Sequence, residues 1–148
     1  MFEMKRFGKI VLLGFLYAIL AQVVHSVSAL FSMGYYTLGT TREVWSVIMM
    51  PSFGPPPPVF FVVSFFFSMV IGIVLAFVYS IIHTSLHGTV SEKGMCFGIL
   101  IFLISGISSG FSTFLLFNVP LMLIWVWAIE AFVISIFGGM IIARVYHK

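Results

Sequence analysis

Charged side chains are scarce in this chain. Lysine, arginine, aspartate and glutamate together make up 7% of its 148 residues, whereas hydrophobic residues make up 61%. A soluble domain of this size carries more charge on its surface. The composition therefore excludes that class and indicates a polytopic membrane protein.

Cysteine is almost absent as well. The single residue, Cys96, excludes an internal disulfide and any metal site built from several cysteines. It lies within an apolar run, where we expect it to be a small buried packing residue. The sequence also contains no Ser-His-Asp grouping, no Gly-Lys phosphate loop and no paired carboxylates, so no enzymatic activity is predicted.

The apolar residues fall into four runs, each long enough to cross a hydrocarbon layer of about 30 Å as a helix. The runs cover residues 10–33, 59–83, 94–117 and 121–143. Val27-Ser28-Ala29 resembles a signal-peptidase site, but we expect the first run to be retained as a span. We predict an all-α membrane protein in which residues 1–148 form a single transmembrane domain, a four-helix transmembrane bundle.

Basic residues flank the spans and do not gather in a patch, so they indicate topology and no nucleic-acid partner. If the N-terminus lies inside, the inner side holds six basic residues and the outer side holds Arg42 alone. The six are Lys5, Arg6, Lys9, Lys93, Arg144 and Lys148. This bias predicts a multi-pass protein with cytoplasmic N- and C-termini, and it argues against dual topology.

The first connection, Gly34 to Pro58, is the longest. Thr40 and Glu43 fit a capping box ahead of Val44–Met50, which predicts a short interfacial helix lying flat on the extracytoplasmic surface. Pro55–Pro58 predicts an extended spacer. Gly88 predicts the end of the second helix, and Asn118-Val119-Pro120 predicts a tight turn between the third and fourth spans.

Small residues recur at every fourth position in each span, which places them on one helix face. Such stripes let membrane helices approach closely, and they predict a compact bundle. The first span carries Gly14 and Ala18, followed by Gln22 and Ser26, and the second carries Ser64, Ser68, Gly72, Ala76 and Ser80. The third span carries Gly94, Gly98, Gly106 and Gly110, and the fourth carries Ala131, Ser135, Gly139 and Ala143.

The second and fourth spans also resemble each other. The segment from Ser68 to Tyr79 matches the segment from Ser135 to Tyr146 at five positions. The match suggests two hairpins of the same orientation, related by a pseudo-two-fold axis along the membrane normal. Apolar sequences also match by chance, and that alternative stays open.

Glu130 is the one charged residue in an otherwise apolar run. A carboxylate at that depth needs a partner, a proton or a function. At 100° per residue it lies roughly 160° from the mean direction of its own small-residue stripe. If the stripe faces the bundle interior, Glu130 faces away from the interior. It is then either protonated or in contact with another subunit. A role in coupling to protons or cations is the alternative.

His25 lies at a similar depth in the first span. A His25–Glu130 pair would resolve the desolvation of both groups. His25 lies on the small-residue side of its helix and Glu130 does not, so pairing within one bundle and pairing between copies both remain open. A neutral histidine bonded to Gln22 or to a serine is the simpler alternative.

His83 and His87 share a helix face if the second helix continues that far. That spacing suits a metal or a haem, which His147 and Glu92 could complete on the same side of the membrane. A helix end in the headgroup region is the more common explanation, so no metal or haem cofactor is predicted.

Three functions follow from these observations. The first is a non-catalytic subunit or scaffold whose partners are the lipid bilayer and other membrane-protein subunits or itself. The second is a small oligomeric proton- or cation-coupled transporter or channel that uses Glu130. The third is a haem- or metal-binding redox subunit that uses His83, His87 and His147.

Overall fold

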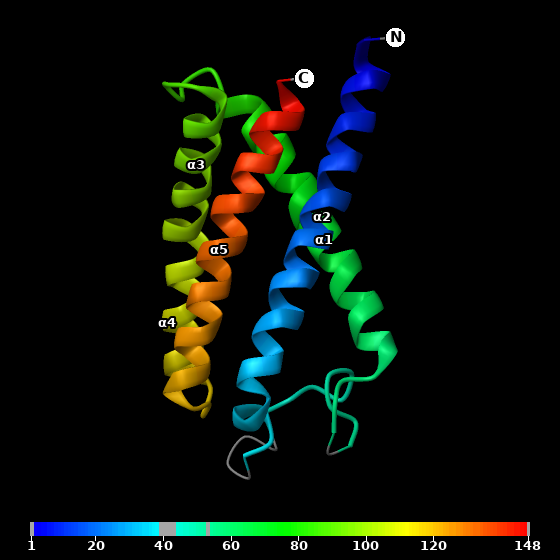
Figure 1. Ribbon diagram of the computed structural model, residues 1–148, viewed down its shortest axis with the longest axis vertical. Helices are drawn as coiled ribbons and strands as arrows, with labels where there is room; N and C mark the ends of the chain where they lie inside the picture. Colours follow the sequence, from blue (N-terminus) through cyan, green and yellow to red (C-terminus); the bar gives the residue numbers. More distant parts are fainter. Residues whose placement is uncertain (1, 39–43, 53, 148) are drawn as a thin grey trace.

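The computed structural model describes residues 2–38, 44–52 and 54–147, and it is helical throughout its apolar runs (Figure 1). Within these residues, four helices are long and apolar enough to cross a membrane, as the sequence predicted. The first, second and fourth of these helices are α1 (Phe2–Tyr36), α2 (Pro58–Ile82) and α5 (Leu121–Tyr146). The third helix has three consecutive parts: α3 (Val90–Ile101), a π-helical turn (Phe102–Gly106) and α4 (Ile107–Leu116).

The helices alternate in direction, so both termini and the connection between α2 and α3 lie at one end of the molecule (Figure 1). We call this the terminal end, and we call the opposite end, with the connection between α1 and α2, the loop end. The main packing partners are α3 with α5, α5 with α1, and α1 with α2. Helix α5 therefore has neighbours on two sides.

Helices α1 and α2 meet through small residues. A Cβ atom on Gly14 would lie 2.7 Å from the carbonyl oxygen of Met69, and one on Gly72 would lie 2.6 Å from the Cβ atom of Tyr17. These distances are too short for any side chain larger than hydrogen. The small-residue stripes of α1 and α2 therefore form the contact that the sequence predicted.

Helices α3 and α5 approach just as closely. A Cβ atom on Gly94 would lie 2.7 Å from the Cα atom of Met140, and one on Gly139 would clash with the backbone of Gly94 and Gly98. Along the third helix, these close contacts end at Gly98. A Cβ atom on Gly106 would meet the Phe102 ring of its own helix, and one on Gly110 would meet nothing within 4 Å, so neither glycine marks a close backbone approach like that at Gly94.

Three of the five matched positions of the suggested repeat are buried in both segments, whereas the pairs Val78 and Val145, and Tyr79 and Tyr146, differ in burial. The buried pairs are Ser68 and Ser135, Gly72 and Gly139, and Ala76 and Ala143. The two halves do not pack with two-fold symmetry, however. Helix α1 packs on α5, whereas the equivalent pair, α3 and α2, is not among the substantial contacts. The repeat remains a prediction about the sequence.

Two local features differ from expectation, and a third prediction is not tested. Val44–Met50 forms turns, with the N–H groups of Met49 and Met50 both donating to the Ser46 carbonyl, because so short a segment cannot repay the cost of helix nucleation. The Thr40–Glu43 capping box lies outside the described residues. Cys96 is exposed and not buried, because it lies away from the one face of α3 that packs on α5.

The start of the third helix differs too. Helix α2 ends at Ile82, and Gly88 lies in a turn with φ of +99° just before α3. Thr89 caps α3: its hydroxyl accepts from the Glu92 N–H, and the Glu92 carboxylate accepts from the Thr89 N–H. Gly88 therefore supports the entry into α3 and does not end α2.

Candidate functional site

Helix α5 buries two opposite faces, and this decides where Glu130 lies. Its small residues Ser135, Gly139 and Ala143 pack toward α3, whereas Glu130 and Gly138 turn toward α1. The prediction that Glu130 faces away from the bundle is therefore wrong. The small residues of α5 face α3, and α1 covers the other side of α5.

Glu130 pairs with His25 of α1. The Nδ1 atom of His25 lies 2.5 Å from the Oε2 atom of Glu130. The Glu130 side chain is 8% exposed, whereas the His25 side chain is 49% exposed. Of the two open alternatives, the structure brings the residues together within one chain, where each satisfies the polar group of the other.

The pair lies well inside the membrane-spanning part of both helices. Glu130 is nine residues from the start of α5 at Leu121, which corresponds to about 14 Å of helix. An isolated carboxylate at that depth is costly, but a proton shared between the carboxylate and the imidazole keeps the pair neutral as a whole. Such a pair can hold two helices together.

Further polar contacts surround the pair. Gln22 lies one turn from His25 on the same side of α1, and its Oε1 atom accepts a hydrogen bond of 3.4 Å from the Ser64 hydroxyl of α2. Toward the loop end, the Trp127 indole donates to the Tyr36 hydroxyl at 2.7 Å. The hydroxyl of Tyr36 also lies within electrostatic reach of Glu130. These contacts link α1, α2 and α5 across the half of the molecule nearer the loop end.

Three aromatic residues close the loop end. Trp45 packs against Tyr36 and Trp127 with ring centroids 5.1 and 6.1 Å away, and its indole donates to the Tyr36 carbonyl. Trp45 thus anchors the connection between α1 and α2 to the helices. Tyr36 and Trp127 were not among the predicted site residues, although aromatic residues at span ends are the expected anchors of a membrane protein.

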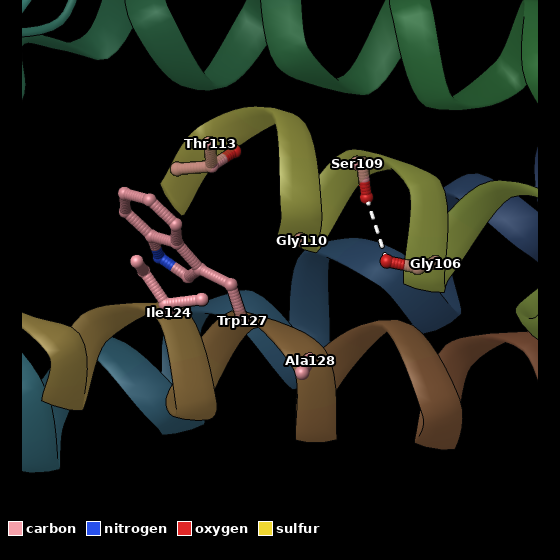
Figure 2. Close-up of a pocket in the computed structure, with 7 residues that line it drawn as sticks. All are labelled: Gly106, Ser109, Gly110, Thr113, Ile124, Trp127 and Ala128. Carbon is pink, nitrogen blue, oxygen red and sulfur yellow. Dashed lines mark hydrogen bonds between the residues drawn. The ribbon is translucent and has the colours of Figure 1, made fainter. Parts of the chain in front are cut away.

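A small pocket of about 110 Å³ lies between α4 and α5 (Figure 2). Ser109, Gly110 and Thr113 line it from α4, and Trp127 and Ala128 from α5. The Ser109 hydroxyl donates to the Gly106 carbonyl, next to the π-helical turn. The pocket therefore follows from the loose packing of α4 on α5, and it contains no titratable group.

The terminal end gathers a second group of polar and aromatic side chains. Because α2 ends at Ile82, His83 and His87 do not share a helix face as the metal hypothesis required. His83 instead lies against α5, with its ring centroid 5.6 Å from that of His147. His147 hydrogen-bonds the Tyr79 hydroxyl at 3.2 Å.

The described residues contain no group of three histidine, cysteine or acidic side chains placed to hold one metal ion. The His83 and His147 rings instead pack with Tyr79 and Tyr146. Partial desolvation, together with the nearby His83 and Lys93, lowers the pKa of His147 below its usual value. A lowered pKa keeps the ring neutral, which suits its place in this aromatic cluster.

Comparison with known proteins finds no matching family model, no similar curated protein and no similar solved structure. The four apolar helices make the chain a small multi-pass integral membrane protein.

Proposed function

We propose that this protein is a non-catalytic membrane subunit that works by packing against other membrane-spanning chains, either copies of itself or other subunits. The observation that supports this most directly is that α4 has no buried residue. Its outer surface nevertheless carries hydroxyl groups: Ser108 and Ser112 are both exposed. Small and hydroxyl residues are typical of helix–helix interfaces in membranes.

The four spans differ in how much of their surface the chain itself covers. Within the most apolar part of each span, 28% of residues are buried in the first and fourth spans, against 6% in the third. The fourth span is thus a central element, whereas the third is a peripheral one, and the surface of its α4 part is open. A partner that covers α4 would give its hydroxyl residues the packing that the chain does not provide.

The orientation proposed for this subunit has both termini in the cytoplasm. The terminal end carries Lys9, Lys93 and Arg144 at the ends of three helices. This distribution supports the positive-inside assignment.

The experiment is purification in mild detergent of two differently tagged copies expressed together, followed by identification of every chain that is retained. We expect retention of the second copy or of a fixed set of other membrane proteins. The double variant Ser108→Leu/Ser112→Leu should reduce retention, because bulky side chains disturb the open face of α4. Phe111→Leu, at another exposed position of α4, is the control. Recovery of the wild type as a single chain without partners would reject the proposal.

A second candidate is proton or cation coupling through the His25–Glu130 pair. It is favoured by the depth of the pair in the membrane and by the half-exposed His25 ring. In proteoliposomes, Glu130→Gln should abolish pH-dependent flux, because an amide cannot release a proton. Glu92→Gln, at the start of α3, should not. Absence of wild-type flux above that of empty liposomes would reject this candidate.

A further inference from the structure

His25 has a second ring nitrogen, and the proton balance of the pair decides its state. Glu130 occupies Nδ1. If the pair is neutral as a whole, the shared proton lies either on the carboxyl group or on Nδ1. In both arrangements Nε2 carries a hydrogen. The remaining arrangement, with Nε2 bare, leaves a net negative charge in the hydrocarbon and is costly. In a neutral pair, Nε2 of His25 is therefore a hydrogen-bond donor.

This donor lacks an acceptor within the described part of the chain, where the one hydrogen bond of the His25 side chain is that to Glu130. The ring is half exposed, on a stretch of α1 whose neighbouring side chains Val23, Val27 and Leu30 are exposed and apolar. Lipid tails offer no acceptor, and an unsatisfied N–H group in hydrocarbon is costly. A second membrane-spanning element beside His25, with an acceptor at that depth, would satisfy this donor.

We propose that the acceptor is the Ser108 hydroxyl of a second copy of this chain, which docks the open face of its α4 beside His25. Ser108 lies about 12 Å of helix from the end of α4 at Leu116, and Glu130 about 14 Å from the adjacent end of α5. Copies with the same orientation in the membrane therefore bring Ser108 to the depth of the His25–Glu130 pair.

The chemistry of α4 fits this role. Ser108 is exposed, with Ser105 one turn away on one side and Ser112 one turn away on the other. A serine in a membrane helix can donate to a carbonyl of its own helix, as Ser105 does to Ile101, and still accept a hydrogen bond. The His25 surface supplies a donor, and the open face of α4 supplies acceptors.

The interface joins two different surfaces, since His25 lies on α1 and Ser108 on α4. In a pair joined by such a head-to-tail contact, each copy still has one of the two surfaces free. Further copies can therefore add, and they form a ring if the rotation from one copy to the next returns to the first copy. The inference rests on the proposed function, because it names the partner and the contact of the same open face of α4.

The test uses cysteine cross-linking in intact membranes, with Cys96 replaced by alanine. Ala29→Cys and Ser112→Cys each lie one turn toward the loop end from the residues of the proposed contact, so His25 and Ser108 stay intact. Two tagged chains, one with each substitution, should form a disulfide-linked dimer on oxidation. Either chain alone should give little dimer. Thr113→Cys, which faces the pocket beside α5, is the matched control for Ser112→Cys.

The hydrogen bond itself has a separate readout. Ser108→Ala should lower the association constant of the copies about threefold to tenfold, the range expected for one hydrogen bond between membrane helices. Ser108→Thr should restore it, and Ser109→Ala should leave it unchanged.

Two results would overturn the inference alone: an assembled chain without the 29–112 cross-link, or an assembly that responds equally to Ser108→Ala and Ser109→Ala. A chain that does not associate with any other would overturn the proposed function as well.

Discussion

Glu130 of α5 and His25 of α1 lie 105 residues apart in the sequence, yet their side chains meet at 2.5 Å inside the membrane-spanning part of the molecule. The pair offsets part of the cost of placing both polar groups in hydrocarbon. The pair also connects the first helix to the last, and the contact of α1 with α5 is the main one between the two halves of the chain.

Replacing Glu130 therefore tests how the halves are joined. Glu130→Leu should lower the free energy of unfolding by about 1–2 kcal/mol, because it removes a hydrogen bond between membrane helices. Glu130→Gln should cost less, since the amide still bonds the imidazole. In a His25→Phe background, Glu130→Leu should add little. Unfolding of each variant in detergent measures these differences, and equal costs in both backgrounds would contradict the pairing.

The glycine contacts make a second prediction. Gly72→Leu and Gly98→Leu should each destabilise the fold by about 1–3 kcal/mol or more, because the neighbouring helix backbone leaves no room for a side chain. Gly110→Leu belongs to the same sequence stripe as Gly98 but lies in open space, so it should leave the fold intact.

Thermal unfolding in detergent compares these variants, with Val70→Leu at an exposed position of α2 as the control. Similar losses at Gly98 and Gly110 would show that the sequence stripe, and not the observed packing, determines stability.

The orientation can be tested by labelling. In a background without Cys96, a cysteine at Ser52 should react with an impermeant thiol reagent from outside the cell, and a cysteine at Ser85 should react only from inside. Both serines are exposed, one in the connection at the loop end and one at the terminal end. Labelling of both positions from the same side would be incompatible with four spans.

His147 gives a prediction about pH. In the folded protein its pKa lies below the usual value of about 6.5. The unfolded chain then binds more protons than the folded chain between the two pKa values, so stability rises with pH through that window and falls on acidification. An NMR titration should place the His147 pKa below that of a model peptide.

Lys93→Gln should raise the pKa of His147, because it removes one of the positive charges that lower it. An unchanged pKa in this variant would contradict the account of the cluster at the terminal end.

The spans were predictable because their signal is physical and local. Twenty or more apolar residues cross a bilayer whatever their neighbours are. The close contacts at Gly72 and Gly139 were also predictable, since small residues four apart define one helix face. The failure of this rule at Gly110 has a clear cause: α4 lies loosely on α5, beside the π-helical turn.

The surroundings of Glu130 could not be derived in the same way. The helical period places Glu130 opposite Gly139, but it does not say that a second helix covers that side. That fact depends on the packing order α3, α5, α1, α2, which no local pattern encodes. Likewise, no local pattern places the end of α2 at Ile82, and this end separates His83 from His87, which the sequence spacing placed on one helix face.

The central claim is that this chain works by associating with other membrane-spanning chains. Mass measurement of the protein released directly from its own membrane vesicles, without detergent extraction, tests it most directly. The account predicts a particle heavier than the single chain of 16.5 kDa, made of several copies or of this chain with other subunits. A particle with the mass of one chain and its bound lipids would contradict it.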